Sequence, residues 1–174
     1  MSPIIPFERK KSGSALSRQS LPIRESGEPI FQFSLGGNNY VVEAIKVTEV
    51  TMVPRLIPIP VSEPFILGVI NLRGNIIPVI DPSRRLEYEP AAIDKNSRLL
   101  IFEIGEMPVG FIVESVNHRL LHGYIEGASS EPTTGKSVFR RFALIADQRY
   151  PLFEPEFLLS QSEISTLQKV KEFF

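Results

Sequence analysis

The sequence predicts a mainly β protein in which one small β unit is used twice and a short helix closes the chain. Three observations support this. Apolar and polar residues alternate with a period of two in several segments, as strands require. The most apolar runs are rich in β-branched residues and are separated by short turns. A spacing of proline, acidic residue and leucine also occurs twice along the chain.

The composition of the chain limits the classes of function that it can have. With 43% hydrophobic and 22% charged residues among 174, the chain has ordinary globular composition. The net charge of −1 gives no overall attraction to nucleic acid. The lack of cysteine excludes disulfides, thiol nucleophiles and thiolate metal sites. No apolar run approaches the roughly 18 residues that span a bilayer and no signal peptide is recognisable, so we expect a cytoplasmic protein without direct membrane insertion.

Residues 1–28 are predicted to be a disordered arm. They are rich in serine and glycine and carry a basic cluster around Arg9, Lys10 and Lys11. Such a composition buries too little apolar surface to compensate for the entropy of ordering. The arm is interpreted as a solvated tail; the alternative is a weak basic arm for an acidic partner or a membrane surface.

The first β unit starts after the arm. Residues 30–35 alternate as a strand, residues 36–39 form a Gly-Gly-Asn-Asn turn, and residues 40–42 return as a second strand. A short helical or irregular piece is expected over 44–47. Four prolines within residues 52–64 exclude a helix interior or a central strand, so this segment is expected to be a stiff, extended surface loop.

A central hairpin follows, in which two apolar runs, 69–72 and 76–80, flank a polar turn. Arg73 lies in this turn, so its cation is expected at the edge of the core. One interpretation makes Arg73 a binding residue. The other makes it a turn arginine that neutralises strand-end carbonyls or pairs with Asp81.

The second β unit is predicted from residue 98 onward. Residues 99–104 and 109–113 form a hairpin, residues 117–136 are predicted to be mostly loop, and a last hairpin covers 138–153 with its turn at Asp147–Gln148. The final residues have helical spacing, with Ser160 or Ser162 as candidate caps and Glu163 in the first turn. The apolar residues of this helix are spaced three apart: Ile164, Leu167 and Val170.

The two halves repeat each other around their last hairpins. The pattern Pro-x-x-acid-Pro-x-x-x-Leu occurs at 78–86 and again at 151–159. The turns differ, because Arg73–Asn75 in the first copy corresponds to Ala146–Gln148 in the second. Since the second copy makes a hairpin without an arginine, we expect Arg73 to serve a function specific to the first half.

Residues that could carry catalysis or bind a cofactor are scarce. His118 and His122 have the spacing of a helical pair, but no third ligand accompanies them, and solvated histidines are expected instead of a metal site. The sequence has no phosphate-binding glycine loop and no nucleophile elbow. We therefore expect no enzyme activity, no cofactor and no metal. The apolar loop at 57–59 near Arg73 instead predicts a protein-binding groove with a cation at its rim.

At this point a family resemblance becomes specific. The stretch Gly68–Asp81, read as GVINLRGNIIPVID, resembles the signature of the CheW-like domains of chemotaxis coupling proteins. Three other segments of the chain also resemble sequence blocks of this family, namely 31–50, 64–68 and 109–116. The resemblance covers roughly residues 30–160. It implies two five-stranded SH3-like β barrels packed on a shared apolar interface, with residues 29–160 as the domain between the arm and a C-terminal helix over 161–174.

The resemblance also implies a function. Such proteins are non-enzymatic signalling adaptors that couple methyl-accepting chemoreceptors to a CheA-type histidine kinase. They pair with the regulatory domain of the kinase, barrel end to barrel end, and the receptor's cytoplasmic tip lies between the barrels, in membrane-bound receptor arrays. Alternatives are an adaptor of a type IV pilus twitching pathway or another chemosensory pathway, and, less favoured, a small β-barrel ligand-binding domain, enzyme or nucleic-acid barrel.

Carried over by motif, the resemblance assigns receptor binding to two short segments, and it assigns no residues to kinase binding. The expected receptor-binding residues are Val47, Glu49, Asn71, Leu72, Arg73 and Gly74. The second half departs from the family pattern, because Arg141 is followed by Phe142 and the closing strand contains Pro151. A proline removes a backbone donor, so this strand is expected to pair less readily with a partner.

Overall fold

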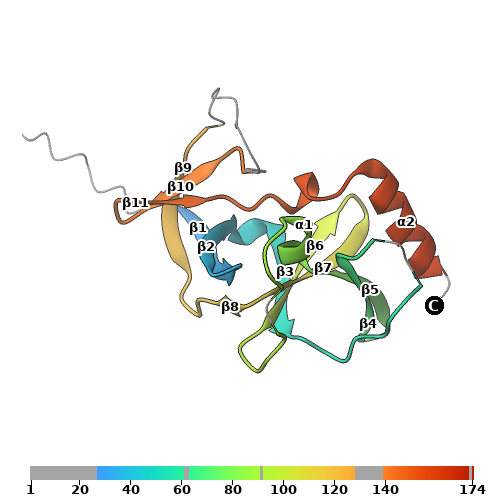
Figure 1. Cartoon of the computed structure of the whole chain (residues 1–174). Coiled ribbons are helices and arrows are strands. Elements are labelled where there is room, and N and C mark those ends of the chain that lie inside the picture. The colour runs from blue at the N-terminus through green and yellow to red at the C-terminus, as the bar shows by residue number, and fades with distance from the viewer. Residues whose placement is uncertain (1–26, 61–62, 91, 128–138, 173) are drawn as a thin grey trace, which may run out of the picture.

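The computed structural model describes residues 27–60, 63–90, 92–127, 139–172 and 174, and its strands form two sheets (Figure 1). The first sheet has the order β11-β10-β9-β1-β2, with β8 also paired to β1. The second has the order β3-β6-β7-β5-β4. The strands of the first sheet are β1 (Glu28–Leu35), β2 (Asn38–Glu43), β8 (Ser115–Val116), β9 (Leu121–Ile125), β10 (Phe142–Ile145) and β11 (Gln148–Pro151). Those of the second are β3 (Val47–Met52), β4 (Ile66–Leu72), β5 (Asn75–Ile80), β6 (Arg98–Ile104) and β7 (Met107–Val113).

The two halves of the chain exchange strands. The hairpin β1–β2 belongs to the first sheet, but the chain then passes through η1 (Ala44–Lys46) and places β3, β4 and β5 in the second. The second half does the reverse, since β6–β7 lies in the second sheet and β8 to β11 lie in the first. The two arrangements match in detail: β5 runs parallel to β7, and Leu152 after β11 forms a parallel bridge to Val41 on β2. Each sheet therefore contains both halves.

A shared apolar core holds the two sheets together. Its largest members are aromatic, with Phe33 from the first sheet and Phe102 and Phe111 from the second meeting around Phe153. Phe153 contacts Phe33 and Phe111 edge to face, with ring centroids 5.2 and 5.7 Å apart, a favourable geometry for aromatic pairs. Smaller clusters fill each sheet separately, around Ile30 in the first and Ile70 in the second. Two small β barrels on a shared apolar interface are thus confirmed, although the first sheet has six strands where five were predicted.

The helical elements are short except at the end of the chain. They are η1, α1 (Pro82–Arg85), η2 (Pro155–Phe157) and α2 (Gln161–Glu172). The predicted cap is confirmed, because the Ser160 hydroxyl accepts from the Glu163 N–H while the Glu163 carboxylate accepts from the Ser160 N–H at 2.6 Å, a reciprocal capping box. Leu167 is fully buried in the shared core. The helix therefore belongs to the packed domain through its apolar side.

Two sequence predictions need correction. The stretch predicted as loop over 117–136 contains β9, which lies between β1 and β10. Gly123 weakened the strand pattern in the sequence, but the packing requires glycine at this position. An added Cβ would come within 2.7 Å of Ile145 and 2.9 Å of the Leu144 carbonyl oxygen. The last turn is Ala146–Asp147, one residue earlier than predicted, and both have positive φ. The predictions for residues 1–26 and 128–138 lie outside the described residues.

Candidate functional site

Arg73 and Gly74 form a tight two-residue turn between β4 and β5. Leu72 pairs with Asn75, and the two turn residues have φ of +53° and +88°. Positive φ at both central positions matches the strand twist of a two-residue hairpin. The Asn71 side-chain oxygen accepts a hydrogen bond from the Gly74 N–H at 2.8 Å. Asn71 and Gly74 therefore fix the turn that presents Arg73.

Glu49 reaches the same place from another part of the chain. It lies on β3, where the register shifts between Val47 and Glu49, and such an irregularity re-aims the side chains beside it. The Arg73 guanidinium donates to both Glu49 oxygens, at 2.8 and 3.0 Å. This two-bond pairing fixes the plane of the guanidinium as well as its position.

The Glu49–Arg73 pair joins opposite ends of the second sheet. β3 is one edge strand, and β4, which enters the Arg73 turn, is the other. The pair therefore lies across the seam where this sheet closes on itself. The Arg73 side chain is 73% exposed and that of Glu49 26%. Solvent screening limits such a pair to about 0.5 kcal/mol of stability, so the pair contributes little to folding and remains accessible from solvent.

The other two predicted residues are partly engaged in packing. Val47 packs against the shared core, and Leu72 packs against the core of the second sheet. The predicted alternative that Arg73 pairs with Asp81 is wrong, because Arg73 pairs with Glu49. Asp81 instead accepts from the Ser83 N–H at 2.9 Å, as the N-cap of α1, and pairs with Arg84 at 3.2 Å.

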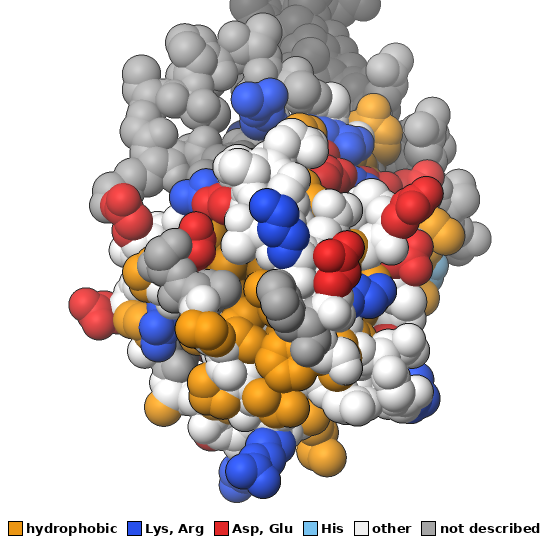
Figure 2. All heavy atoms as spheres, turned by 90° about the vertical axis from the view of Figure 1, so that its right-hand side faces the viewer, with side chains coloured by type: hydrophobic (Ala, Val, Ile, Leu, Met, Phe, Trp, Pro, Cys, Tyr) orange, Lys and Arg blue, Asp and Glu red, His pale blue; other side chains and the backbone are white. Residues whose placement is uncertain are grey.

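The proline-rich loop lies against β4, as the sequence suggested. Ile57 and Val69 exchange two backbone hydrogen bonds of 2.8 and 2.9 Å. Gly68 permits this approach, because its φ is +143° and an added Cβ would lie 2.3 Å from the Ile57 carbonyl oxygen. Figure 2 shows hydrophobic side chains gathered on the face that bears β4, β5 and α2. Partly or largely exposed apolar residues of the loop and hairpin are Leu56, Ile57, Ile59, Leu72 and Ile76.

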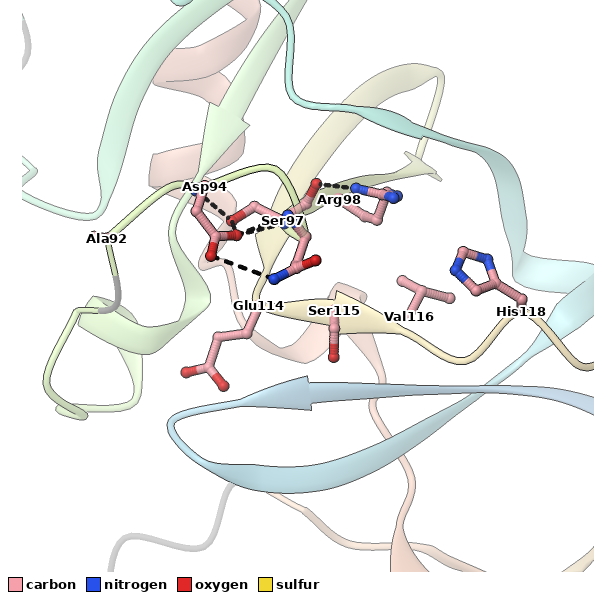
Figure 3. Close-up of a pocket in the computed structure, with 9 residues that line it drawn as sticks. Ala92, Asp94, Ser97, Arg98, Glu114, Ser115, Val116 and His118 are labelled. Carbon is pink, nitrogen blue, oxygen red and sulfur yellow. Dashed lines mark hydrogen bonds between the residues drawn. The ribbon is translucent and has the colours of Figure 1, made fainter.

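A polar pocket of about 410 Å³ opens where the two sheets meet (Figure 3). One wall is the loop before β6, and the other is β8 with the residues around it. The Asp94 carboxylate accepts from the Asn96 and Ser97 N–H groups at 2.8 and 3.1 Å, and these bonds, led by the one from Asn96, lower its pKa. The pocket residues are Ala92, Asp94, Asn96, Ser97, Arg98, Glu114, Ser115, Val116 and His118.

Sequence reasoning missed this pocket. Its walls come from segments that are polar for unremarkable local reasons, and only the meeting of the sheets brings them together. Met52 at the end of β3 is opposite Arg98 in the register, so the strand that carries Glu49 ends beside the pocket. His118 lines the pocket and His122 lies on β9, so they do not form a helical pair.

The described residues of this region lack a metal-binding cluster and a membrane-spanning helix. Within the described ranges, no group of three or more His, Asp or Glu side chains is placed to hold a metal ion. In the same ranges, no helix has the length and apolar content to cross a membrane. The region combines the fixed Glu49–Arg73 pair, the exposed apolar residues of the proline-rich loop and hairpin, and the polar pocket at the junction of the sheets.

Comparison with known proteins gives a consistent family. The CheW-like domain model matches residues 29–161. The chain is 33% identical over 93 residues to the chemotaxis protein CheW of Bacillus subtilis (strain 168), an alignment that covers 53% of this chain and 60% of that protein. It is 32% identical over 84 residues to the protein PilI of Pseudomonas aeruginosa, covering 48% of this chain and 47% of PilI.

A solved structure extends the agreement to three dimensions. The scaffolding protein TtCheW of Thermoanaerobacter tengcongensis is 32% identical, with a TM-score of 0.68. The superposition covers 76% of this chain and 92% of TtCheW. The family model, the fold of two barrels and the Gly68–Asp81 hairpin all agree, and the chain belongs to the CheW-like domain family.

Proposed function

We propose that this chain is a non-enzymatic signalling adaptor that couples methyl-accepting chemoreceptors to a CheA-type histidine kinase. The cytoplasmic tip of the receptor binds the surface formed by Val47, Glu49, Asn71, Leu72, Arg73 and Gly74. The observation that carries the proposal is the two-bond Glu49–Arg73 pair, which is exposed and contributes little to folding. An arginine fixed in this way presents a rigid fork of donors to a partner.

The proposed unit is residues 29–160, with the arm 1–28 and the helix 161–174 flanking it. The protein acts in the cytoplasm, at membrane-bound receptor arrays, and pairs with the regulatory domain of the kinase. An adaptor of a type IV pilus pathway or another chemosensory pathway is the second candidate, and the similarity to PilI supports keeping it. Pull-down from the source cell separates the two by identifying the kinase and receptors that are recovered.

The direct test is Arg73→Ala, measured by co-sedimentation with receptor-containing membranes and by kinase autophosphorylation. We expect at least a tenfold loss of receptor binding because the rigid donor fork is removed. The melting temperature should fall by only about 2 °C, since the exposed ion pair contributes about 0.5 kcal/mol. Lys169→Ala, on an exposed position of α2, is the control that removes a cation elsewhere.

A charge exchange distinguishes the ion pair from the arginine itself. Glu49→Arg combined with Arg73→Glu preserves opposite charges across the seam but moves the guanidinium to β3. If binding needs the arginine at the turn, the double variant stays inactive. Full binding by either Arg73→Ala or the double variant would contradict the proposed contact.

A further inference from the structure

The polar pocket between the two sheets has acidic groups at one end and basic groups at the other. In Figure 3 the carboxylates of Asp94 and Glu114 lie on one side of the pocket, and the Arg98 guanidinium and the His118 ring lie on the other. The space between them is about 410 Å³, within the range of pockets that hold small molecules. The pocket therefore offers separate positions for a cationic and an anionic group.

Asp94 keeps acceptor capacity at the acidic end although it also orders the loop before β6. Its Oδ1 accepts from the Asn96 and Ser97 N–H groups at 2.8 and 3.1 Å. Among the described residues, its Oδ2 accepts one long bond of 3.5 Å, from the Asn96 side chain. The backbone bonds, led by the one from Asn96, lower the pKa of Asp94, so this carboxylate is charged at neutral pH.

Glu114 adds a second carboxylate beside the turn between β1 and β2. Both of its oxygens accept from the same donor, the Gly37 N–H, at 3.3 Å. One shared donor at this distance uses little of a carboxylate, which has about four lone-pair positions. The acidic end can therefore accept further hydrogen bonds, as an ammonium group with its three N–H donors requires.

Arg98 supplies a fixed cation at the other end of the pocket. Its Nη1 donates to the backbone carbonyl oxygens of Lys95 and Ser97, both at 2.8 Å. These bonds hold the guanidinium in place, while its Nη2 makes no hydrogen bond to any described residue. The exposed His118 ring also has no hydrogen-bond partner within the described ranges. This end can therefore donate to a carboxylate.

The middle of the pocket is uncharged. Ser115 and Val116 of β8 lie between the two ends in Figure 3, and the Ser115 hydroxyl is 3.3 Å from that of Ser34. Methylene or peptide groups that join two charged ends of a ligand can contact Val116 here. An α-amino acid has no such spacer, because its ammonium and carboxylate groups are bonded to the same carbon.

We propose that this pocket binds a small zwitterion whose ammonium and carboxylate groups are separated by several bonds. The ammonium group binds Asp94 and Glu114, and the carboxylate binds Arg98 and His118. ω-Amino acids and short peptides with free termini share this chemistry. A ligand with a single charge loses the contacts at one end of the pocket, which lowers its affinity. The proposal does not depend on receptor binding.

Proton NMR of the histidine rings tests the site, because the chain has only two histidines. His118 lines the pocket, whereas His122 lies on β9 outside it and serves as the internal control. The full chain is titrated at constant pH with ω-aminohexanoate and, separately, with triglycine; His122→Gln assigns the signals. We expect one or both ligands to shift the His118 signals without shifting those of His122. No shift with either ligand, or equal shifts of both histidines, would overturn the proposal.

Ligands that lack one charge or the spacer test the two ends of the pocket. Hexanoate, hexylamine and glycine are titrated in the same way at equal ionic strength. Each should bind at least tenfold more weakly than the better of ω-aminohexanoate and triglycine. An affinity for any of the three that equals that of the better zwitterion would contradict the need for two separated charges.

Two substitutions test the protein side of the same contacts. Arg98→Gln and Glu114→Gln each remove one charge but leave an amide that can still form hydrogen bonds. Each should weaken binding of the better zwitterion about tenfold, with folding checked by circular dichroism. Arg119→Gln is the control, because Arg119 is exposed nearby but does not line the pocket. If Arg98→Gln does not fold, Glu114→Gln decides alone, and unchanged binding by the folded pocket variants would refute the site.

Discussion

The β4–β5 and β10–β11 hairpins have the same backbone but different chemistry. Both turn through two residues of positive φ, Arg73–Gly74 in the first and Ala146–Asp147 in the second. In the first turn the leading side chain reaches Glu49 with two hydrogen bonds. In the second the equivalent side chain is a methyl group. The repeat thus fixes the shape of the turn, while only one copy uses it to present a cation.

The residues after each hairpin show the same division. Asp81 and Glu154 both precede a proline that begins a helical turn. Asp81 caps α1 through the Ser83 N–H, whereas Glu154 makes no cap and instead pairs with Arg141 at 3.2 Å. The repeated pattern therefore places a bend at the same point of each half, and each copy stabilises the bend with different side chains.

The largest expected loss of stability tests whether the two copies of the repeat contribute equally to the shared core. Phe153 and Ile80 each lie two residues after the repeated proline, and both are buried. Phe153→Ala should lower stability by about 4 kcal/mol and Ile80→Ala by about 3 kcal/mol, because both leave cavities. Urea denaturation followed by circular dichroism measures both. A smaller loss for Phe153→Ala than for Ile80→Ala would show that the central aromatic cluster is not the main contact between the barrels.

The next effect concerns the proline-rich loop that packs against β4 of the first hairpin. Gly68→Ala should cost about 3 kcal/mol, because φ is positive and the new methyl group would meet the Ile57 carbonyl oxygen. Arg141, four residues before the end of β10 as Gly68 is before the end of β4, is the matched position. Arg141→Ala removes partly exposed pairings with Glu154 at 3.2 Å and with Glu43 at 3.6 Å and should cost about 1 kcal/mol. Similar costs at the two positions in thermal unfolding would argue against a close approach of the loop to β4.

A smaller change in stability separates the Glu49–Arg73 ion pair from the backbone strain of the two turns. Ala146→Gly should stabilise the protein by about 1 kcal/mol, because a side chain at positive φ is strained. Arg73→Gly relieves the same strain but loses about 0.5 kcal/mol of ion pairing, so its gain should be smaller. Glu49→Gln in both backgrounds should remove the difference between the two glycine variants. A difference that survives Glu49→Gln in denaturant titration would mean that Arg73 is held by something besides Glu49.

The smallest effect is local and depends on pH. The lowered pKa of Asp94 means that its stabilising bonds to the loop before β6 are present above the ordinary carboxyl value of 3.8 and are lost as the pH falls through the lowered value. The protection factors of the Asn96 and Ser97 amides in hydrogen exchange, relative to the intrinsic rate at each pH, should therefore fall on acidification below that range. Asp94→Asn should weaken the protection at neutral pH as well. Protection at Ser97 that does not depend on pH in the native chain would assign the loop's order to other contacts.

Much of the fold could be predicted because its signals are local. The hairpin from Gly68 to Asp81, the loop with four prolines and the capped helix each follow from residues close together in the sequence. The strand β9 was not predicted because Gly123 weakens the alternating pattern. The need for this glycine follows from its tertiary neighbours, the side chains of Ile30 and Ile145 and the Leu144 carbonyl oxygen. The site was predicted in part, since Glu49 and Arg73 were both named but their pairing was not.

The sequence by itself determined the turn that presents Arg73, the apolar runs that build the barrels and the family signature that joins them. The tertiary structure decided which strands pair. Only the exchange of strands between the halves makes β3 and β4 the two edges of one sheet, brings Glu49 to Arg73 and opens the pocket between the walls at Asp94 and Glu114. Turn and strand signals depend on neighbouring residues, whereas pairing depends on side chains that meet only after the two halves have packed.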